Sequence, residues 1–190
     1  MKVSRKSKRS SAVVFEEIEP FFIDILRGLP SDADPGDHPG ARARLFSAPM
    51  SDADDGDEFV DDWQRLVVPE IRDLFLSARE IVAGDLAALP ASGLPPSSTE
   101  AAGYGELFNP VAFTPTEHRL TIPGDHLEAW LRVLNQARLV LGARRGFDEA
   151  AMNRERPFPP FKAPHERDMF KVNFYDDIQQ LLMQEMGFGE

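Results

Sequence analysis

The chain contains no cysteine among its 190 residues. Disulfide bonds, thiolate nucleophiles and cysteine-based zinc sites are therefore excluded. No stretch approaches the ~20 consecutive apolar residues that a membrane-spanning helix needs. The basic residues at the start are not followed by the apolar core of a secretory signal. We therefore expect a cytoplasmic protein that does not associate with membranes.

Motifs for catalysis and cofactor binding are also missing from the sequence. There is no Walker lysine motif and no G-x-S-x-G elbow, and Gly103-Tyr104-Gly105 has Phe108 where a dinucleotide loop needs a third glycine. The histidines show no i, i+4 pairing of metal ligands: His38, His118, His126 and His165. The sequence predicts no catalytic residue, no metal and no cofactor, and it favours a protein that is not an enzyme.

The sequence has 21 basic residues (Lys and Arg) and 32 acidic residues (Asp and Glu), so its formal net charge is −11. Five of them lie among the first ten residues, where no acidic residue occurs: Lys2, Arg5, Lys6, Lys8 and Arg9. An acidic body disfavours nucleic acid as a partner, because such affinity comes mainly from neutralising phosphates. We predict that residues 1–10 form a solvated, basic terminal segment that is free to move. A third functional hypothesis is a DNA-binding regulator. It requires a basic recognition surface, which only this segment offers.

Acidic residues are concentrated in one run, residues 52–58. A calcium loop is one interpretation, but the run fails the spacing of an EF-hand: if Asp52 takes the first position, Trp63 falls where the bidentate acid belongs. The alternative is a solvated helix start that the helix dipole favours.

Apolar residues recur mainly at helical spacing. Helices are predicted from Phe15 to Leu29, from Pro69 to Pro90, around Trp130 with a glycine cap at Gly146, and near the C-terminus. Extended structure is predicted for residues 3–15 and 111–122, with residues 119–122 as the best strand candidate. We expect a mainly α fold: a single-domain helical bundle, residues 1–190, with a small antiparallel β element. The Gly-, Pro- and Ser-rich residues 91–106 are predicted to be a flexible loop.

The predicted helices carry distinct buried faces. In the second, the buried face is expected to contain Ile71, Leu74, Phe75, Ala78, Ile81, Val82 and Leu89. In the Trp130 helix, Asn135 and Arg138 interrupt a face shared with leucines. A buried polar group without a partner costs roughly 1–3 kcal/mol, so something in the fold or a ligand must meet them.

Two hypotheses remain for the basic cluster of the Trp130 helix. Asn135, Arg138 and Arg144, together with Arg44 from the Arg42-to-Phe46 motif, are candidate binding residues that hold a carboxylate or phosphate. Alternatively, Arg138 pairs with an acidic residue of another helix, which we favour because buried arginines are usually paired internally.

The segments Ala129-Trp130-Leu131, Leu134-Asn135, Arg138-Leu139 and Leu141-Gly142-Ala143-Arg144 resemble the bacterial family Domain of Unknown Function twenty-seventeen. Arg44-Leu45-Phe46 ahead of an acidic segment is similar to a second landmark of that family. Family members often carry an acid after the asparagine and a bulky apolar residue after the second arginine. This chain has Gln136 and Arg145 there.

The resembled family has no assigned activity. In actinobacteria its genes often neighbour that of the adaptor for the Clp protease, which implies a link to proteolysis or its regulation. We therefore expect a non-catalytic protein-interaction or regulatory, adaptor-like module with a protein partner. The alternative is a small-anion-binding protein or enzyme that uses Arg138 and Asn135. The sequence does not determine the oligomeric state.

Overall fold

The computed structural model describes residues 2–7, 10–49, 56–90, 118–147 and 157–187. Their elements, in chain order, are β1 (Lys2–Ser7), β2 (Ser10–Ile18), α1 (Pro20–Asp32), α2 (Pro39–Phe46), α3 (Gly56–Asp62), the π-helix η1 (Trp63–Val67), α4 (Val68–Leu86), β3 (His118–Ile122), the 3-10 helix η3 (Gly124–His126), α5 (Leu127–Arg145) and α7 (Pro164–Glu185). The predicted mainly α fold with a small antiparallel sheet is confirmed. The predicted loop at residues 91–106 lies outside the described residues.

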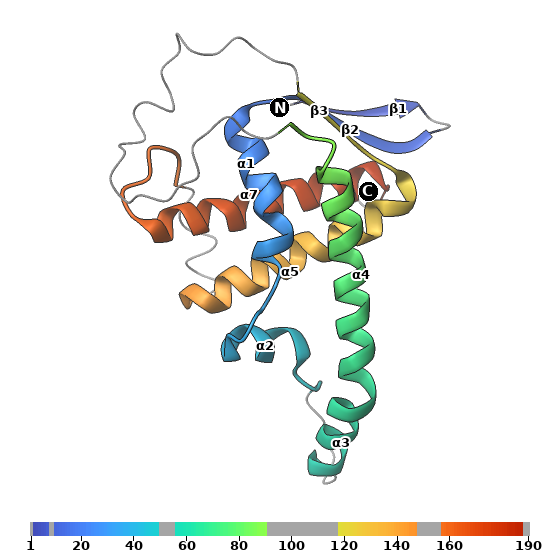
Figure 1. Cartoon of the computed structure of the whole chain (residues 1–190), viewed down its shortest axis with the longest axis vertical. Coiled ribbons are helices and arrows are strands. Elements are labelled where there is room, and N and C mark those ends of the chain that lie inside the picture. The colour runs from blue at the N-terminus through green and yellow to red at the C-terminus, as the bar shows by residue number, and fades with distance from the viewer. Residues whose placement is uncertain (1, 8–9, 50–55, 91–117, 148–156, 188–190) are drawn as a thin grey trace.

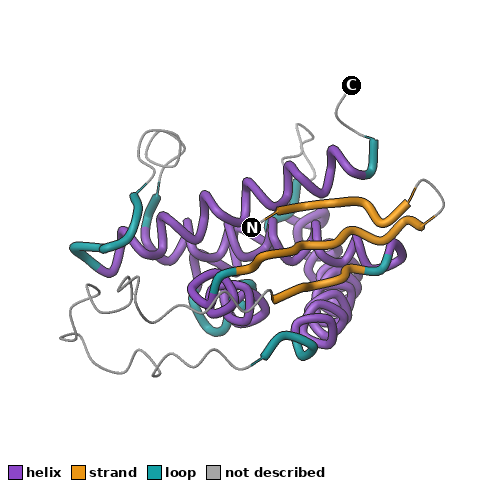
Figure 2. The backbone as a smooth tube through the Cα atoms, turned by 90° about the horizontal axis from the view of Figure 1, so that it is seen from above, coloured by secondary structure: helices purple, strands orange, loops and turns teal. Residues whose placement is uncertain are grey.

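The sheet has three antiparallel strands in the order β1-β2-β3. Figure 2 shows them side by side over the helices. The strand predicted at residues 119–122 is present as part of β3, whereas residues 111–117 lie outside the described residues, and Val13 and Phe15 of β2 pair with Ile122 and Leu120 of β3. The basic residues 2–7 therefore belong to a strand at one edge of the sheet.

The prediction of a helix starting at Phe15 is wrong, because Phe15 and Ile18 lie in β2. In a regular strand these two side chains would point to opposite faces. The register of β2 shifts between them, and Glu17 has a positive φ of 53°. As a result both side chains enter the core, and their spacing imitates that of a helix.

The first helix, α1, begins only at Pro20, which occupies its first turn, where no backbone N–H is needed. It also continues beyond the predicted end: Pro30 lies inside it, and Ala33 caps it by donating its backbone N–H to Leu29. A proline in the last turn removes only one helical hydrogen bond, so the helix tolerates it.

Helices α5 and α7 lie side by side, and α1, α2 and α4 each pack against α5 (Figure 1). The apolar core is one cluster contributed by β2, β3, α1, α4, α5 and α7. Its largest fully buried side chains include Trp130, Tyr175, Phe15, Ile18 and Leu134. Helix α5 is thus the central element on which the others are assembled.

Helix α4 is longer than the body it packs against. Its first half, together with η1 and α3, extends away from the sheet to the opposite end of the molecule (Figure 1). We call residues 56–76 the arm. Within the described residues, six large apolar side chains are exposed, and five of them lie on the arm: Phe59, Val60, Leu66, Leu74 and Leu76.

Candidate functional site

The predicted basic cluster of α5 does not lie on one face. Asn135 is exposed, so the prediction that it shares the buried face is wrong. At about 100° per residue, Asn135 lies about 140° from Trp130, on the side opposite Val133 and Val140, which are buried. The buried polar residue is instead its neighbour Gln136, only 2% exposed.

Arg138 is held by α7. Its guanidinium lies 2.8 Å from Asp176 and donates a hydrogen bond of 3.0 Å to Gln179. The side chains of Arg138 and Asp176 are 29% and 27% exposed, so the pair is partly shielded from water. The preferred hypothesis of an internal acidic partner therefore matches the geometry, although the pair is not sealed inside.

The remaining predicted binding residues lie elsewhere. Arg144, exposed near the end of α5, donates to the backbone carbonyl of Asp34 at 2.8 Å. Arg44 is exposed on α2. Because Arg138 faces α7 whereas Arg144 reaches the turn after α1, the four predicted residues Asn135, Arg138, Arg144 and Arg44 do not form one site.

A different set of arginines surrounds a pocket of about 160 Å³ between α2, α4 and α5. Arg42 of α2 and Arg72 and Arg79 of α4 supply three positive charges. Its apolar wall consists of Phe46, Phe75 and Leu76. The turn at residues 34–36 forms one side, and Gln136 of α5 also lines it. We call this the arginine pocket.

Helical spacing aligns the side chains that line the pocket. Arg72, Leu76 and Arg79 are spaced i, i+4 and i+7 on α4, and Arg42 and Phe46 are spaced i and i+4 on α2, so each set occupies one face. The guanidinium of Arg72 lies 5.2 Å from the centre of the Phe46 ring, within the range of a cation–π contact. This contact joins α2 to α4 across the pocket.

Asp34 supplies the carboxylate of the pocket lining. Its Oδ1 accepts a hydrogen bond from the backbone N–H of Gly36 at 3.0 Å and lies 3.0 Å from the guanidinium of Arg79. The backbone hydrogen bond from Gly36 lowers the pKa of the Asp34 carboxyl most; partial burial opposes it, and the hydrogen bond and then the charge of Arg79 lower the pKa further. Asp34 is therefore ionised at neutral pH and holds Arg79, whose side chain is only 16% exposed.

Gln136 contributes an unsatisfied amide. Both its Oε1 and its Nε2 are buried, and neither has a hydrogen-bond partner among the described residues. A buried polar group in this state costs about 1–3 kcal/mol. An unpaired amide that lines a pocket is a sign of binding, because a guest can supply the missing partners.

The chain matches the family described as "Domain of unknown function (DUF2017)" over residues 6–186. It belongs to this family. No curated protein and no solved structure matches the chain. Membership in DUF2017 is thus shown across nearly the whole sequence, and the resemblance seen around Trp130 is confirmed.

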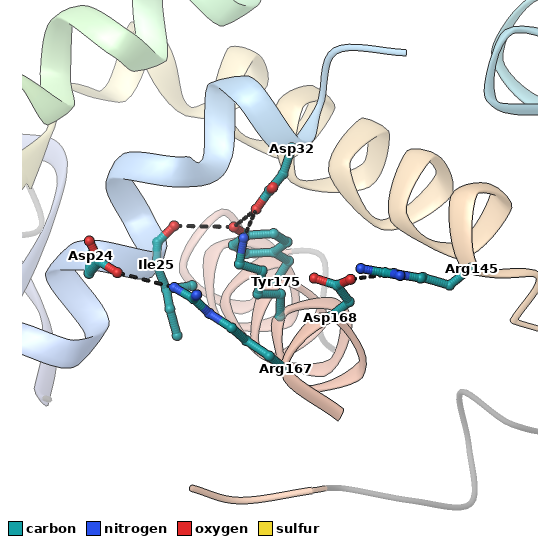
Figure 3. A network of polar contacts seen from close by, with 8 residues as sticks. Asp24, Ile25, Asp32, Arg145, Arg167, Asp168 and Tyr175 are labelled. Carbon is teal, nitrogen blue, oxygen red and sulfur yellow. Dashed lines mark hydrogen bonds and ion pairs between the residues drawn. The ribbon is translucent and has the colours of Figure 1, made fainter. Parts of the chain in front are cut away.

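Two other polar clusters in this DUF2017 chain join helices. In the first, the buried Tyr175 hydroxyl of α7 lies 2.8 Å from Asp32 and 3.2 Å from the carbonyl of Ile25, both on α1, and Lys171 lies 2.7 Å from the same carboxylate (Figure 3). Figure 3 also shows Arg167 paired with Asp24 of α1 and Arg145 of α5 paired with Asp168. These contacts satisfy one another and fasten α7 to α1 and α5.

The second cluster is centred on Asp85 near the end of α4. Its Oδ2 accepts a hydrogen bond of 2.8 Å from the indole N–H of Trp130, and its Oδ1 lies 3.0 Å from Nδ1 of His126. Trp130 is fully buried, so its N–H requires such a partner. Asp85 therefore fixes α4 to the start of α5.

The outward face of the arm carries a stripe of apolar and acidic side chains. Leu66, Glu70, Asp73 and Leu74 follow one another at i, i+4, i+7 and i+8, and all four are exposed. Leu66 is 59% exposed and Leu74 is 45% exposed. The prediction that Leu74 belongs to the buried face of its helix is wrong, because Leu74 faces away from α2, which packs against Arg72 and Phe75 on the other side of α4. We call these four residues the outer stripe.

Sequence reasoning missed the arginine pocket. The i, i+4, i+7 spacing of Arg72, Leu76 and Arg79 was visible in the sequence, but only the apolar residues of α4 were used to assign its faces. Arg42 lies two residues before Arg44, and the pattern alone does not distinguish them. The contact of α2 with α5, which turns Arg42 toward the pocket, was the missing information.

Two sequence expectations concern absences. Among residues 2–7, 10–49, 56–90, 118–147 and 157–187, no group of three His, Asp or Glu side chains is placed to hold a metal ion. The acidic run considered for calcium falls mostly outside these ranges. No helix of the described part is both long and apolar enough to cross a bilayer.

Proposed function

We propose that this protein is a non-catalytic protein-interaction module and that it contacts its partner through the outer stripe. The observation that carries the proposal is the exposure of Leu66 and Leu74 on a projecting helix. Single exposed leucines are common on protein surfaces. Here, however, most of the large apolar side chains that are exposed in the described ranges gather on one arm, which is typical of a surface that another protein covers.

The charges of the outer stripe indicate the chemistry of the partner. Glu70 and Asp73 lie between the two leucines, and neither forms an ion pair within the described part of the chain. A partner with apolar side chains flanked by lysine or arginine would bury the leucines and neutralise the carboxylates. An acidic stripe also disfavours self-association, because a second copy would bring like charges together.

The test uses the native cytoplasm, where we place the protein. The full chain and the variant Leu66→Ser/Leu74→Ser serve as cross-linking baits, with Arg44→Ser as a matched control elsewhere on the surface. A partner that is captured by the wild type and the control, lost with the double variant, and weakened by added salt supports the proposal. Its apolar, basic contact segment must then bind the purified protein directly.

Three results contradict this proposal. One is that no captured protein depends on the two leucines. Another is a concentration-dependent dimer that the double variant abolishes, which would assign the stripe to a second copy. The third is a direct partner whose contact segment is acidic. The link to proteolysis implied by the family's gene neighbourhood makes the Clp protease and its adaptor the first purified proteins to try.

Binding of a small anion is the second candidate function. The arginine pocket favours it, whereas the residues first expected to bind an anion do not converge: Arg138 is already neutralised by Asp176. If the protein binds an anion, we propose that it does so with Arg42, Arg72 and Arg79. Loss of binding in Arg138→Gln with retention in Arg72→Gln would contradict this assignment.

A further inference from the structure

The arginine pocket has an excess of positive charge in an otherwise acidic protein. Three guanidiniums line it against the one carboxylate of Asp34. Asp37 lies 3.9 Å from Arg42, but its side chain is fully exposed, so water screens that contact. Arg72 forms no ion pair with any described residue. The charge balance therefore favours an anionic guest, and guanidiniums suit a carboxylate or a phosphate group.

Gln136 distinguishes between these two kinds of anion. Its amide presents an N–H donor and a carbonyl acceptor, and neither has a partner in the described part of the chain. The dianion of a phosphate ester or an isolated carboxylate has only acceptor atoms, so it would leave the Gln136 carbonyl unsatisfied. A guest that satisfies the whole amide needs a hydrogen-bond donor, such as a backbone N–H group, next to its negative charge.

The size and the wall of the pocket limit the guest further. A volume of about 160 Å³ is below the roughly 300–1,000 Å³ of pockets that enclose drug-sized ligands. Mononucleotides are therefore disfavoured, whereas a single amino-acid residue is of suitable size. Phe46, Phe75 and Leu76 offer an apolar surface to its side chain.

We propose that the arginine pocket binds the C-terminal residue of a polypeptide whose last side chain is apolar. The terminal carboxylate accepts hydrogen bonds from Arg42, Arg72 and Arg79. The backbone N–H of the same residue donates to Oε1 of Gln136, and the side chain packs against the two phenylalanines. Capture of a chain terminus is an established mode of peptide recognition. This site goes beyond the outer stripe and does not depend on it.

Calorimetric titration of the full chain tests this with a short, uncharged peptide that ends in leucine. We expect a Kd of about 10 μM to 1 mM for the free carboxylate, and binding at least about tenfold weaker for the same peptide with a C-terminal carboxamide. Arg72→Gln should also weaken binding about tenfold. Because Arg72 is exposed, this variant should fold as the wild type does, which circular dichroism checks.

Control variants separate this site from its surroundings. Arg44→Gln removes a neighbouring positive charge of α2 outside the pocket and should leave the Kd unchanged. Leu66→Ser/Leu74→Ser should also bind the peptide normally, so failure of the outer-stripe proposal is distinguishable from failure of this one. Gln136→Leu keeps the size of the side chain and removes its amide, and we expect it to fold and to bind the peptide more weakly.

Several outcomes would overturn the inference. Equal affinity for the carboxylate and the carboxamide would show that the terminus is not recognised. Inorganic phosphate that competes more strongly than the peptide would assign the pocket to phosphate. N-acetylleucine carries the same carboxylate, N–H and side chain as the last residue of the peptide, so a peptide that binds while N-acetylleucine does not would show that these three groups are not what the pocket recognises. An amidated peptide with an internal aspartate that binds as well would assign it to acidic side chains.

Discussion

Gln136 and Arg138 lie two residues apart on α5, and only Arg138 has partners, at the ends of its guanidinium; its buried Nε and the Gln136 amide have none among the described residues. Arg138 reaches α7, where Asp176 and Gln179 accept its hydrogen bonds. Gln136 lines the arginine pocket and has no partner within the described residues. The sequence predicted that polar groups interrupt the face of this helix. It could not assign them, because the partners come from segments that lie far away along the chain.

Removal of the Arg138 guanidinium tests its structural role. Arg138→Ala leaves Asp176 without its ion pair in a partly shielded position, so we expect the free energy of unfolding to fall by about 1–2 kcal/mol. Urea denaturation measures this, and a double-mutant cycle with Asp176→Ala should give a coupling of about 1 kcal/mol.

The matched control for Arg138 lies on the same helix. Arg132 pairs with Glu128 one turn away on the surface, and such pairs contribute about 0.3–0.5 kcal/mol. Arg132→Ala should therefore cost clearly less than Arg138→Ala. If the two variants are equally stable, the ion pair between α5 and α7 contributes no more to stability than a surface pair does.

At the level of elements, periodicity located most helices and the described parts of both extended segments correctly. It failed where a local irregularity changes the period: the register shift in β2 brings Phe15 and Ile18 to one side and imitates a helix. It also failed where an element leaves the body. Leu74 has the spacing of a buried residue, but no described element covers its side of α4, whereas α2 packs against the side that carries Arg72 and Phe75. Whether a helical residue is buried depends on the elements that pack against the helix, and the sequence of the helix itself does not specify them.

Substitution by alanine should change the stability of the protein in opposite directions at two glycines, one that caps a helix and one inside a helix. Gly146 caps α5 with a left-handed φ of 66°, which alanine adopts at a cost of about 1–2 kcal/mol. Gly84 lies within α4, and a Cβ there meets nothing within 4 Å. Gly84→Ala should therefore stabilise the protein by about 0.5–1 kcal/mol. Thermal denaturation, monitored by circular dichroism, measures the stability of both variants. A change of stability of the same sign in both variants would contradict the prediction.

The whole molecule is assembled around α5, so its long-range contacts determine where a site forms. The arginine pocket needs α2, α4 and α5 to meet, and these elements come from both sides of the undescribed residues 91–117. The sequence could supply the arginines and the amphipathic helices, but not their meeting point. By contrast, family membership was visible from short segments, the Trp130 helix and the Arg44-Leu45-Phe46 motif, because recognising them requires no knowledge of the tertiary contacts.

Stability of the whole protein should decline at alkaline pH because of Tyr175. Burial, and next the charge of Asp32, raise the pKa of its hydroxyl well above the usual 10.0. Above about pH 10 the unfolded chain loses this proton while the folded chain keeps it, so the folded state binds more protons. The free energy of unfolding is therefore unaffected below that pH and falls above it.

Tyr175→Phe tests the cause of this decline. The variant loses about 1 kcal/mol at neutral pH with the hydrogen bond to Asp32, but its stability should then change less between about pH 9 and pH 11. The other tyrosine, Tyr104, is kept in both chains and serves as the internal control. Equal alkaline losses in urea titrations of both proteins would exclude Tyr175 as the cause.

The chain's two tryptophans report on different parts of the molecule. Trp130 is enclosed in the body with its N–H bound to Asp85, whereas Trp63 lies half-buried on the arm, 3.2 Å from the carbonyl of Phe46. Phe46 also forms part of the pocket wall. The emission of Trp63 is therefore a natural optical signal for events at the arm and the pocket, while that of Trp130 changes only when the body opens, and the protein needs no attached dye to separate the two.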